Sequence, residues 1–429
     1  MLSVLRPETL SFISQFPGGL IPLPSPGEPD SVLVVKVPKE YILAAVLKRG
    51  FKVYVLPIHV ADTDTAFLVS AFFDDEEEPL AIRTPLLRGW LTSLLLMRLL
   101  TDEINVHFFD EHDREHAAFK ARLNVPVATR QLLLHSELLP ETNFNARAVL
   151  DEAGRIFGLR DTASEAAAID VEFGESLMPE DLFMADMRPD LHAFHGSKGW
   201  SEWALVREEP GPAHEVDIAQ LLQRIFPANT IYINPKRPNN DREIADVLVI
   251  TSQVVLILQA KDSPNTAKGL MAPLDKKRRK VMSAVSDAAR QVKRAAQYIR
   301  SSPTLVMKVG GATVQIELNG RPIAGLVVVK ELFLDSYDEY TSILLSLSST
   351  INGPCIVLDY PELNAYTKYL RDENSFREAF MRVFDAGRET GRFLRLRFGL
   401  SDPEGSSDQT NGLNVRVGQP FFARKVPGI

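Results

Sequence analysis

Two neighbouring stretches decide the fold of this chain, Glu243-Ile-Ala-Asp246-Val-Leu-Val-Ile250 and Val254-Val-Leu-Ile-Leu-Gln259-Ala-Lys261. Both are apolar and rich in β-branched residues, which favours buried strands. Thr251-Ser252-Gln253 lies between them and suits a hairpin turn. The sequence therefore predicts two adjacent strands.

Polar residues stand only at the ends of these stretches. Because side chains alternate along a strand, Gln259 and Lys261 share one face and Ala260 points away. Asp246 starts one strand and these two residues end the next, so all three can converge on one spot. This placement favours a metal-binding site of the kind that phosphodiesterases use.

From about residue 206 to 385 the chain resembles the PD-(D/E)XK nuclease superfamily and is most similar to its Mrr-like and nuclease-related, NERD-like, branches. In that pattern a helix with an inward acidic residue precedes a strand, an acidic strand, a strand ending in (D/E/Q)-X-K, and a helix that bears Gln. The matching positions are Glu215 on a helix at about 213–226, Asp246, Gln259-Ala260-Lys261 and Gln291. Gln259 stands where most members have Asp or Glu, as it does in the Mrr-like branch.

The resemblance implies an α/β fold: a C-terminal restriction-endonuclease-like mixed sheet flanked by helices, at residues 206–400. It also implies a metal-dependent endonuclease that hydrolyses DNA phosphodiester bonds. Restriction or antiviral defence is suggested as the setting by fold-level analogy alone.

The chemistry of such a site needs oxygen ligands for a hard divalent cation, Mg²⁺ or Mn²⁺. The expected ligands are Asp246, Glu215, the Gln259 amide oxygen and the Ala260 carbonyl. Lys261 is expected to orient the attacking water or to neutralise charge on the phosphate. Glu243 lies three residues before Asp246, where its side chain favours the opposite strand face, so we assign it only a supporting role.

Each of these elements also has an ordinary structural explanation. Gln-X-Lys alone is a weak match, and one acidic residue beside Val-Leu-Val-Ile is common in buried sheets. Two alternatives therefore stay open. The domain is either a catalytically inactive nuclease fold that binds nucleic acid or a protein partner, or the chain is a protein-interaction factor in which the acidic N-terminal domain dominates.

The distribution of charge favours a nucleic-acid partner more than its total of −8 does. Residues 1–200 hold 18 Lys/Arg and 30 Asp/Glu, a net −12, whereas residues 201–429 hold 30 and 26, a net +4. Residues 261–300 alone contain 11 basic and 3 acidic residues. This basic segment directly follows the predicted metal site.

The segment 279–300 reads as a helix, with Val281, Val285, Ala288, Val292 and Ala296 along one stripe. A solvated helix whose basic run only keeps the surface soluble is the plainer alternative. Aromatic residues for base stacking are not interleaved with its charges. The residues expected to bind DNA phosphates are Lys276, Lys277, Arg278, Arg279, Lys280, Arg290, Gln291, Lys293 and Arg294.

The length of 429 residues exceeds a usual single core, so two domains are expected. The single Cys355 lies in an apolar run and is expected to be a core residue. The apolar stretch at 86–100 contains Arg88 and Arg98 and is too short to span a membrane. We expect a cytoplasmic protein with no secretory leader and no membrane partner.

Residues 1–160 form a separate α+β domain of unassigned family. Strands are predicted at 31–37, 52–59, 66–73, 80–83 and 104–109, with a helix at 38–49 and a buried helix at 86–101. The acidic run at 74–79 suits a solvated hairpin tip. Such a domain would provide regulation, self-association or contact with a protein partner.

His112 and His116 stand four residues apart, which on a helix is an acceptable spacing for zinc. The order is not His-Glu-X-X-His, so the metalloprotease arrangement is missing. We interpret the stretch as a polar helix start capped by Asp110 or Asp113.

Residues 161–205 read as a linker, with His192 and His195 as connector residues rather than ligands. Strands at 323–330 and 355–359 and helices at 361–370 and 373–386 are expected to complete the C-terminal core. Residues 401–429 read as a flexible segment with a possible edge strand at 415–423.

Overall fold

The computed structural model describes residues 1–24, 31–60, 62–156, 162–179, 182–209, 211–262, 264–396 and 421–423. The chain divides into two compact units. Unit 1 consists of Met1–Leu182, Asn265–Met271 and Arg397–Ile429, and unit 2 of Phe183–Pro264 and Ala272–Leu396. The short segment at 265–271 thus leaves unit 2 and joins unit 1 before the chain returns.

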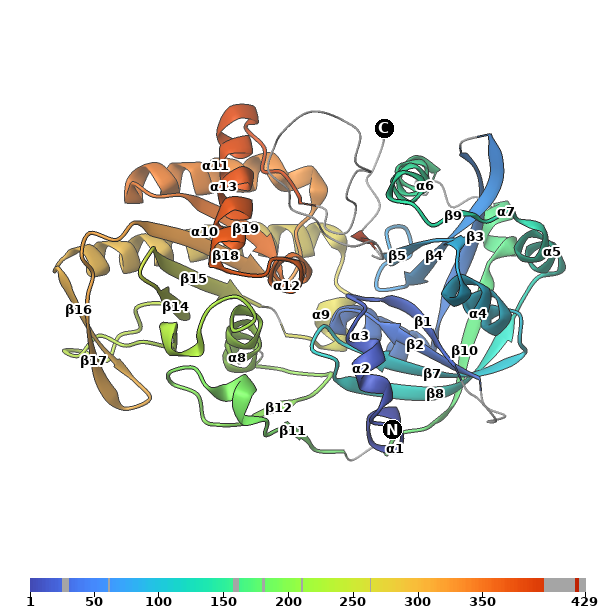
Figure 1. The fold of residues 1–429 in the computed structure, drawn as a ribbon, viewed down its shortest axis with the longest axis horizontal. Coiled ribbons are helices and arrows are strands. Elements are labelled where there is room, and N and C mark those ends of the chain that lie inside the picture. The colour runs from blue at the N-terminus through green and yellow to red at the C-terminus, as the bar shows by residue number, and fades with distance from the viewer. Residues whose placement is uncertain are drawn as a thin grey trace. The chain divides into compact units, whose positions relative to one another are not determined.

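Unit 1 is built on a nine-stranded sheet of order β1-β2-β7-β8-β10-β3-β4-β5-β20 (Figure 1). Its neighbours are antiparallel except β2 and β7, which are parallel. The five strands predicted in residues 1–160 are all present, because their β-branched and aromatic residues suit a pleated, buried surface. The strands are β1 (Gly19–Leu23), β2 (Val32–Lys36), β3 (Gly50–Val60), β4 (Thr63–Phe72), β5 (Leu80–Pro85), β7 (Glu103–Phe109), β8 (Glu115–Asn124), β10 (Ile169–Ser176) and β20 (Phe421–Ala423).

The helix predicted at 86–101 is shorter and less buried than expected. Helix α4 spans Trp90–Leu99, because Leu87–Arg88 form strand β6, paired with β9 (Leu139–Pro140). Trp90 and Met97 are 59% and 58% exposed, since α4 packs by one face only. The other helices of unit 1 are α1 (Leu2–Leu5), α2 (Thr9–Ile13), α3 (Lys39–Lys48), α5 (Val127–His135), α6 (Asn143–Ile156), α7 (Thr162–Ala167) and α9 (Ala267–Leu270).

The acidic run at 74–79 forms the predicted turn between β4 and β5, with Glu76 and Glu77 exposed, but Asp74 is buried and accepts the Leu80 N–H at 3.3 Å. There the Asp75 carboxylate accepts the backbone N–H groups of Glu77 and Glu78, each at 3.0 Å. Among the described residues, no helix combines the length and the apolar character needed to cross a membrane.

Residues 161–205 contain regular structure where a loose linker was predicted. β10 lies between β8 and β3 in the unit 1 sheet, and its inward residues Ile169, Val171 and Phe173 are buried. β11 (Met184–Asp186) pairs with β12 (Ser201–Trp203) in unit 2. The alternation over 169–173 is short, which explains why the strand was not recognised.

The histidines of this segment pack against unit 2. His192 ends a 3₁₀ turn (Pro189–His192), and its Nε2 lies 3.4 Å from Nε2 of Gln220. His195 stacks on Tyr232 with ring centroids 4.6 Å apart. Both side chains therefore contribute to packing.

The predicted edge strand at 415–423 is present over Phe421–Ala423, where β20 pairs with β5 at one edge of the unit 1 sheet. Residues 397–420 and 424–429, which include most of the segment predicted to be flexible, lie outside the described residues.

Unit 2 is built on a five-stranded mixed sheet of order β13-β14-β15-β18-β19. β13, β14 and β15 are antiparallel neighbours, and β15, β18 and β19 are parallel. The strands are apolar because helices flank both faces of the sheet (Figure 1). They are β13 (Ile231–Ile233), β14 (Val247–Ile250), β15 (Val255–Lys261), β18 (Ile323–Val329) and β19 (Cys355–Asp359, with Cys355 fully buried).

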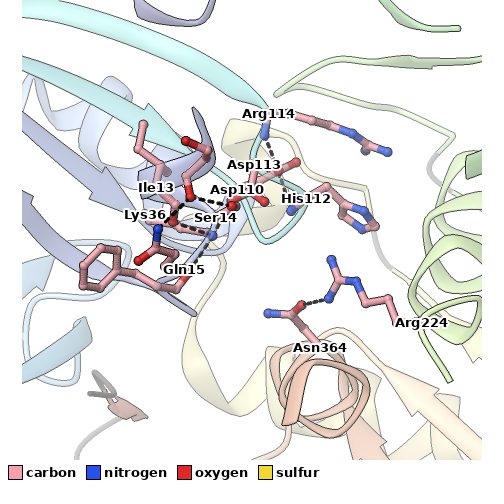
Figure 2. Close-up of polar contacts among 12 residues, drawn as sticks. Ile13, Ser14, Gln15, Lys36, Asp110, His112, Asp113, Arg114, Arg224 and Asn364 are labelled. Carbon is pink, nitrogen blue, oxygen red and sulfur yellow. Dashed lines mark hydrogen bonds and ion pairs between the residues drawn. The ribbon is translucent and has the colours of Figure 1, made fainter. Parts of the chain in front are cut away.

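Helix α10 connects β15 to β18 and packs on both strands and on α11, whereas α8 packs on β13, β15 and α12. Arg224, just after α8, donates from Nη1 to Asn364 Oδ1 of α12 at 2.7 Å (Figure 2). A separate hairpin of β16 (Thr304–Val309) and β17 (Ala312–Glu317) follows α10. The helices are α8 (Gly211–Leu222), α10 (Leu274–Arg300), α11 (Tyr337–Ile351), α12 (Tyr360–Tyr369) and α13 (Glu373–Thr390).

Three helix boundaries in unit 2 differ from the prediction, and the first is that α13 ends at Thr390 rather than at 386. α8 ends at Leu222 rather than near 226. α10 begins at Leu274, directly after Pro273, rather than at 279. Proline suits the position before a helix start, because its ring restricts φ and because it lacks a backbone N–H that would have no partner there. The basic run 276–280 therefore lies inside α10 rather than in front of it.

Candidate active site

The start of β14 and the end of β15 bring a carboxylate and an amide together at the edge of the unit 2 sheet. Val247 pairs with Leu258 in antiparallel register, so Asp246 stands opposite Gln259. Asp246 Oδ2 accepts the backbone N–H of Ala260 at 2.6 Å. Asp246 and Gln259 are only 5% and 2% exposed. The structure thus unites two of the predicted site residues.

The Gln259 amide links this pair to helix α10. With its nitrogen turned toward the surrounding acceptors, it donates to Asp246 Oδ1 at 2.9 Å and to Gln291 Oε1 at 3.0 Å. Buried amides need such partners, because an unsatisfied polar group is costly away from water. Residues from β14, β15 and α10 therefore form one hydrogen-bonded network.

Glu215 reaches the network from α8. Its Oε2 accepts a hydrogen bond from Asn234 Nδ2 at 2.8 Å. Asn234 directly follows β13, and its backbone N–H donates to the Asp246 carbonyl at 2.9 Å. It has a φ of 49°, in the left-handed region that Asn adopts more readily than most residues. Sequence reasoning missed Asn234, although an Asn closing a short apolar run before Pro235 was a usable signal.

Lys261 ends β15, pairs in register with Val329 and is partly buried. Its charge lowers the pKa of both Asp246 and Glu215, so the ammonium is near both carboxylates. Ala260 contributes its N–H to the network, and its carbonyl as a metal ligand stays a prediction.

Glu243 lies in the loop before β14 and is exposed. It pairs with Lys236 in the same loop, so the alternation of β14 does not govern the direction of its side chain. After burial, the neighbouring Glu243 carboxyl group is a further cause that raises the pKa of Asp246. The supporting role of Glu243 stays a prediction.

The electrostatics follow from this crowding of acids. Burial, followed by the hydrogen bond with Glu243, raises the pKa of Asp246 to about 8, against the opposing Ala260 N–H and Lys261 charge. Burial also raises the pKa of Glu215, against its bond from Asn234. Near neutral pH the site therefore retains protons that a divalent cation would displace.

The donor set fits a hard cation. Among the described residues, no group of three or more His, Cys, Asp and Glu side chains is arranged to hold a metal ion. The predicted ligands of this site, however, include two amide oxygens, those of the Gln259 side chain and the Ala260 backbone. An inward Gln259 oxygen would lie 2.9 and 3.2 Å from the Asp246 oxygens and 3.0 Å from Gln291 Oε1. Neighbouring ligands in an octahedral Mg²⁺ shell of about 2.1 Å radius are also about 3 Å apart.

The predicted DNA-binding residues of α10 differ in availability. Arg278 lies 3.2 Å from Asp335 and stacks over Phe333, and Arg290 pairs with Asp287, so both are engaged within unit 2. Within the described part of the chain, the exposed members of the same set that form no ion pair are Lys276, Arg279, Lys280, Lys293 and Arg294.

Distance along α10 separates these cations further. The run 276–280 precedes Gln291 by 11 to 15 residues, about 17–22 Å at 1.5 Å per residue. Lys280 and Arg294 nevertheless lie on the same side of α10 as Gln291. Lys280 precedes Gln291 by 11 residues, which make three turns, and Arg294 follows it by three residues, which make nearly one turn. The basic run therefore lies well away from the Asp246 network.

The predicted polar helix start is wrong, and the helical spacing considered for zinc is lost with it, because His112 and His116 do not lie on a helix. His112 lies in the turn after β7 and His116 in β8. In the turn, the Asp110 carboxylate accepts the N–H groups of His112 at 2.8 Å and Arg114 at 3.0 Å (Figure 2). Buried His116 places Nε2 2.9 Å from Asp110 Oδ2. Asp110 thus serves as the acceptor for the turn and for one nitrogen of His116.

One further carboxylate lies at the same edge of the sheet. Asp359 ends β19, caps α12 through the N–H of Glu362, and pairs with Arg395 at 2.8 Å. Its bonds are used to hold α12 and the chain after α13.

No protein-family model, curated protein or solved structure matches this chain. Its function must therefore be argued from the site itself.

Proposed function

We propose that unit 2 is a metal-dependent nuclease of the PD-(D/E)XK type that hydrolyses DNA phosphodiester bonds. The observation that carries the proposal is the single network of Asp246, Gln259 and Gln291, bordered by Glu215 and Lys261. The order of acidic helix, acidic strand, Gln-X-Lys strand and Gln-bearing helix agrees with the resemblance. The mixed sheet that holds them gives additional support.

In this proposal Asp246, Glu215 and the oxygens of Gln259 and Ala260 hold Mg²⁺ or Mn²⁺. When bound, the ion supplies Lewis acidity toward the phosphate and a water of lowered pKa. Lys261 neutralises the negative charge that develops on the phosphate. Its place beside two carboxylates keeps the ammonium close to the reacting group.

The surrounding residues prepare these ligands. Asn234 keeps Glu215 turned toward the site through its 2.8 Å hydrogen bond. Burial and the neighbouring Glu243 raise the pKa of Asp246, so Asp246 would have to lose its proton to hold a cation. Gln259 would exchange its inward nitrogen for its oxygen at the same moment, because a cation attracts the oxygen and repels the N–H dipoles.

A catalytically inactive module is the second candidate. Asp246 already accepts hydrogen bonds from Ala260 and, in the orientation described above, from Gln259, so the network is satisfied without a cation. Such a module would bind DNA or a protein partner.

A plasmid-nicking assay separates the two candidates. The parent protein, Asp246→Asn and Lys261→Ala are incubated with supercoiled DNA and Mg²⁺ or Mn²⁺, with EDTA as the metal control. Asp190→Asn is the matched variant, because Asp190 is an exposed carboxylate of unit 2 outside the Asp246 network and outside the loop at 234–244. Nicking by the parent and Asp190→Asn alone supports the nuclease. Metal-independent binding with no nicking by any form supports the inactive module.

The biological setting is proposed by analogy. Restriction or antiviral defence in the cytoplasm follows from the resemblance. Unit 1 would then supply regulation, self-association or contact with a protein partner.

A further inference from the structure

A small antiparallel ladder adjoins the Asp246 network in unit 2. The loop at 234–244 folds back on itself, and backbone hydrogen bonds of 2.8 Å on either side make Lys236 the partner of Glu243. On its other side Lys236 exchanges two backbone hydrogen bonds, each 2.8 Å, with Lys308 of β16. Glu243, Lys236 and Lys308 thus occupy matching positions on three neighbouring segments.

The register places these three side chains in one row. Residues directly opposite on antiparallel strands project from the same face. Neighbouring strands are about 4.8 Å apart, so the backbones of Lys236 and Lys308 lie about 5 and 10 Å from that of Glu243. Asn234 donates its backbone N–H to the Asp246 carbonyl at 2.9 Å, and Lys236 follows it by two residues, so the row adjoins the proposed metal site.

The two lysines of this row are available for an anion. Lys236 is exposed, and within the described part of the chain its ammonium makes no side-chain hydrogen bond or ion pair. Lys308 contacts Asp241 at 2.9 Å, but that carboxylate is 68% exposed, and such surface pairs contribute little. Neither charge is required by the packing of the ladder.

The opposite face of the same ladder has a structural task. Arg237, next to Lys236, lies over the Tyr298 ring of α10 at 4.5 Å from its centroid. The Tyr298 hydroxyl in turn donates to the Val306 carbonyl of β16 at 3.0 Å. These contacts fix the ladder to α10, so the lysine row has a rigid support.

We infer that Lys236 and Lys308 bind successive backbone phosphates of the DNA strand that unit 2 cleaves, an inference that rests on the proposed function. One strand of a duplex carries a phosphate per about 3.4 Å of axis, so a row reaching about 10 Å spans about three phosphates. Phosphate contacts set the register of a strand without reading its bases.

The position of Tyr298 gives the row a direction along α10. Tyr298 follows Gln291 by seven residues, whereas the basic run 276–280 precedes it. The lysine row and the basic run therefore lie on opposite sides of the Asp246 network along this helix. A strand that crosses the site would meet positive charge on both sides, and the nearer contacts are those of Lys236 and Lys308.

Salt-dependent DNA binding tests the inference. Binding of the full-length protein to a short fluorescent duplex, and to one of its single strands, is measured by anisotropy in EDTA over a range of KCl concentrations. Lys236→Gln and Lys308→Gln are each expected to reduce the slope of log affinity against log salt by about one. Arg242→Gln is the matched control, because Arg242 is exposed in the same loop but projects from the opposite face.

The outcomes separate this inference from the nuclease itself. The inference is supported if the salt slope falls in both lysine variants and falls by less than half as much in Arg242→Gln. Lys236→Arg and Lys308→Arg should also recover the slope of the parent. Equal slopes in the lysine variants and Arg242→Gln overturn the inference, even if the parent cleaves DNA. If the parent binds with the expected slope but never cleaves, the phosphate-binding role of the lysines stands and the nuclease proposal is overturned. No binding to either probe overturns both.

Discussion

Both units bury carboxylates, but in opposite surroundings. In unit 1, burial opposes a lowered pKa at Asp110, but His116, followed by Arg114 and His112, lowers it well below the ordinary range. Glu115, also against burial, is held to a pKa of about 2 by His107 and the start of α1. In unit 2, burial and Glu243 raise the pKa of Asp246 to about 8.

The difference separates structural from chemical use of a buried charge. Carboxylates matched with cations or N–H groups stabilise the fold. Carboxylates placed beside one another destabilise the fold unless a bound cation offsets their charges. Glu111 of unit 1 shows that a raised pKa is insufficient alone, because burial and Asp110 raise its pKa to about 8 as well. What distinguishes Asp246 is convergence with amides and a second carboxylate from other elements.

The largest effect is expected from Asp110→Ala, which should lower the free energy of unfolding by about 3–5 kcal/mol. The change leaves buried His116 and two N–H groups without their acceptor. Urea unfolding followed through Trp90, which lies in unit 1, measures the loss in a Trp200→Phe/Trp203→Phe background. Asp102→Ala, at a side chain 94% exposed, is the control. Equal losses in the two variants would show that Asp110 is not part of a structural pair.

Asp246→Asn should reduce cleavage without reducing stability. Cleavage is expected to fall on the order of 10²–10³-fold, because the variant loses the charge that binds the cation and stabilises the transition state. The free energy of unfolding should not fall with it, since the amide replaces a buried acid that lies beside a second acid. Initial nicking rates and urea unfolding of the same preparations measure both quantities. Loss of stability together with activity would place Asp246 in the same class as Asp110.

The pH dependence of stability should also have opposite signs for Glu115 of unit 1 and Asp246 of unit 2. The folded pKa of Glu115, about 2, lies below its ordinary 4.5, so its contribution is present above about pH 4.5 and lost as pH falls toward 2. This difference in pKa corresponds to about 3 kcal/mol. Glu115→Gln should therefore remove that part of the acid sensitivity.

For Asp246 the sign is reversed. Its folded pKa is raised from 3.8 to about 8, so its contribution is present below about pH 4 and lost as pH rises through 8. Asp246→Asn should gain stability relative to the parent above pH 8. Unfolding curves from acid to alkaline pH for the parent, Glu115→Gln and Asp246→Asn test both pH dependences. Parallel curves for parent and variants would remove the distinction between the two clusters.

Local patterns predicted most strands of the nine-stranded and five-stranded sheets, although not β1 or β8, and the central pair of site residues. The apolar runs before and after 251–253 fixed β14, β15 and their antiparallel register, which brings Asp246 to Gln259 without further information. Helical periodicity likewise located α10, α12 and α13. These features depend on residues close in sequence, where alternation and helix period carry the signal.

Long-range pairing was not predictable in the same way. β10 takes its partners from β8 and β3, and its own alternation covers only a few residues. His112 and His116 have a helix-compatible spacing, but the Asp110 carboxylate stabilises a turn between strands. Asn234 gains its role only once β13 is placed beside β14. Each depends on a partner distant in sequence or on turn chemistry that competes with periodicity.

The smallest predicted effect tests whether the unit 2 network depends on positioning as well as on charge. Asn234→Gly preserves the left-handed backbone at φ 49° and removes only the amide that donates to Glu215. Because groups that orient metal ligands typically contribute about 10–100-fold, cleavage at limiting Mg²⁺ should fall about tenfold. Saturating Mg²⁺ should restore part of the rate, since Glu215 remains able to bind. Asn239→Gly, in the exposed tip of the same loop, controls for backbone flexibility. Equal rates for Asn234→Gly and Asn239→Gly across the Mg²⁺ titration would mean that Glu215 is not a ligand, and would leave Asp246 as the only carboxylate on which the contrast with unit 1 depends.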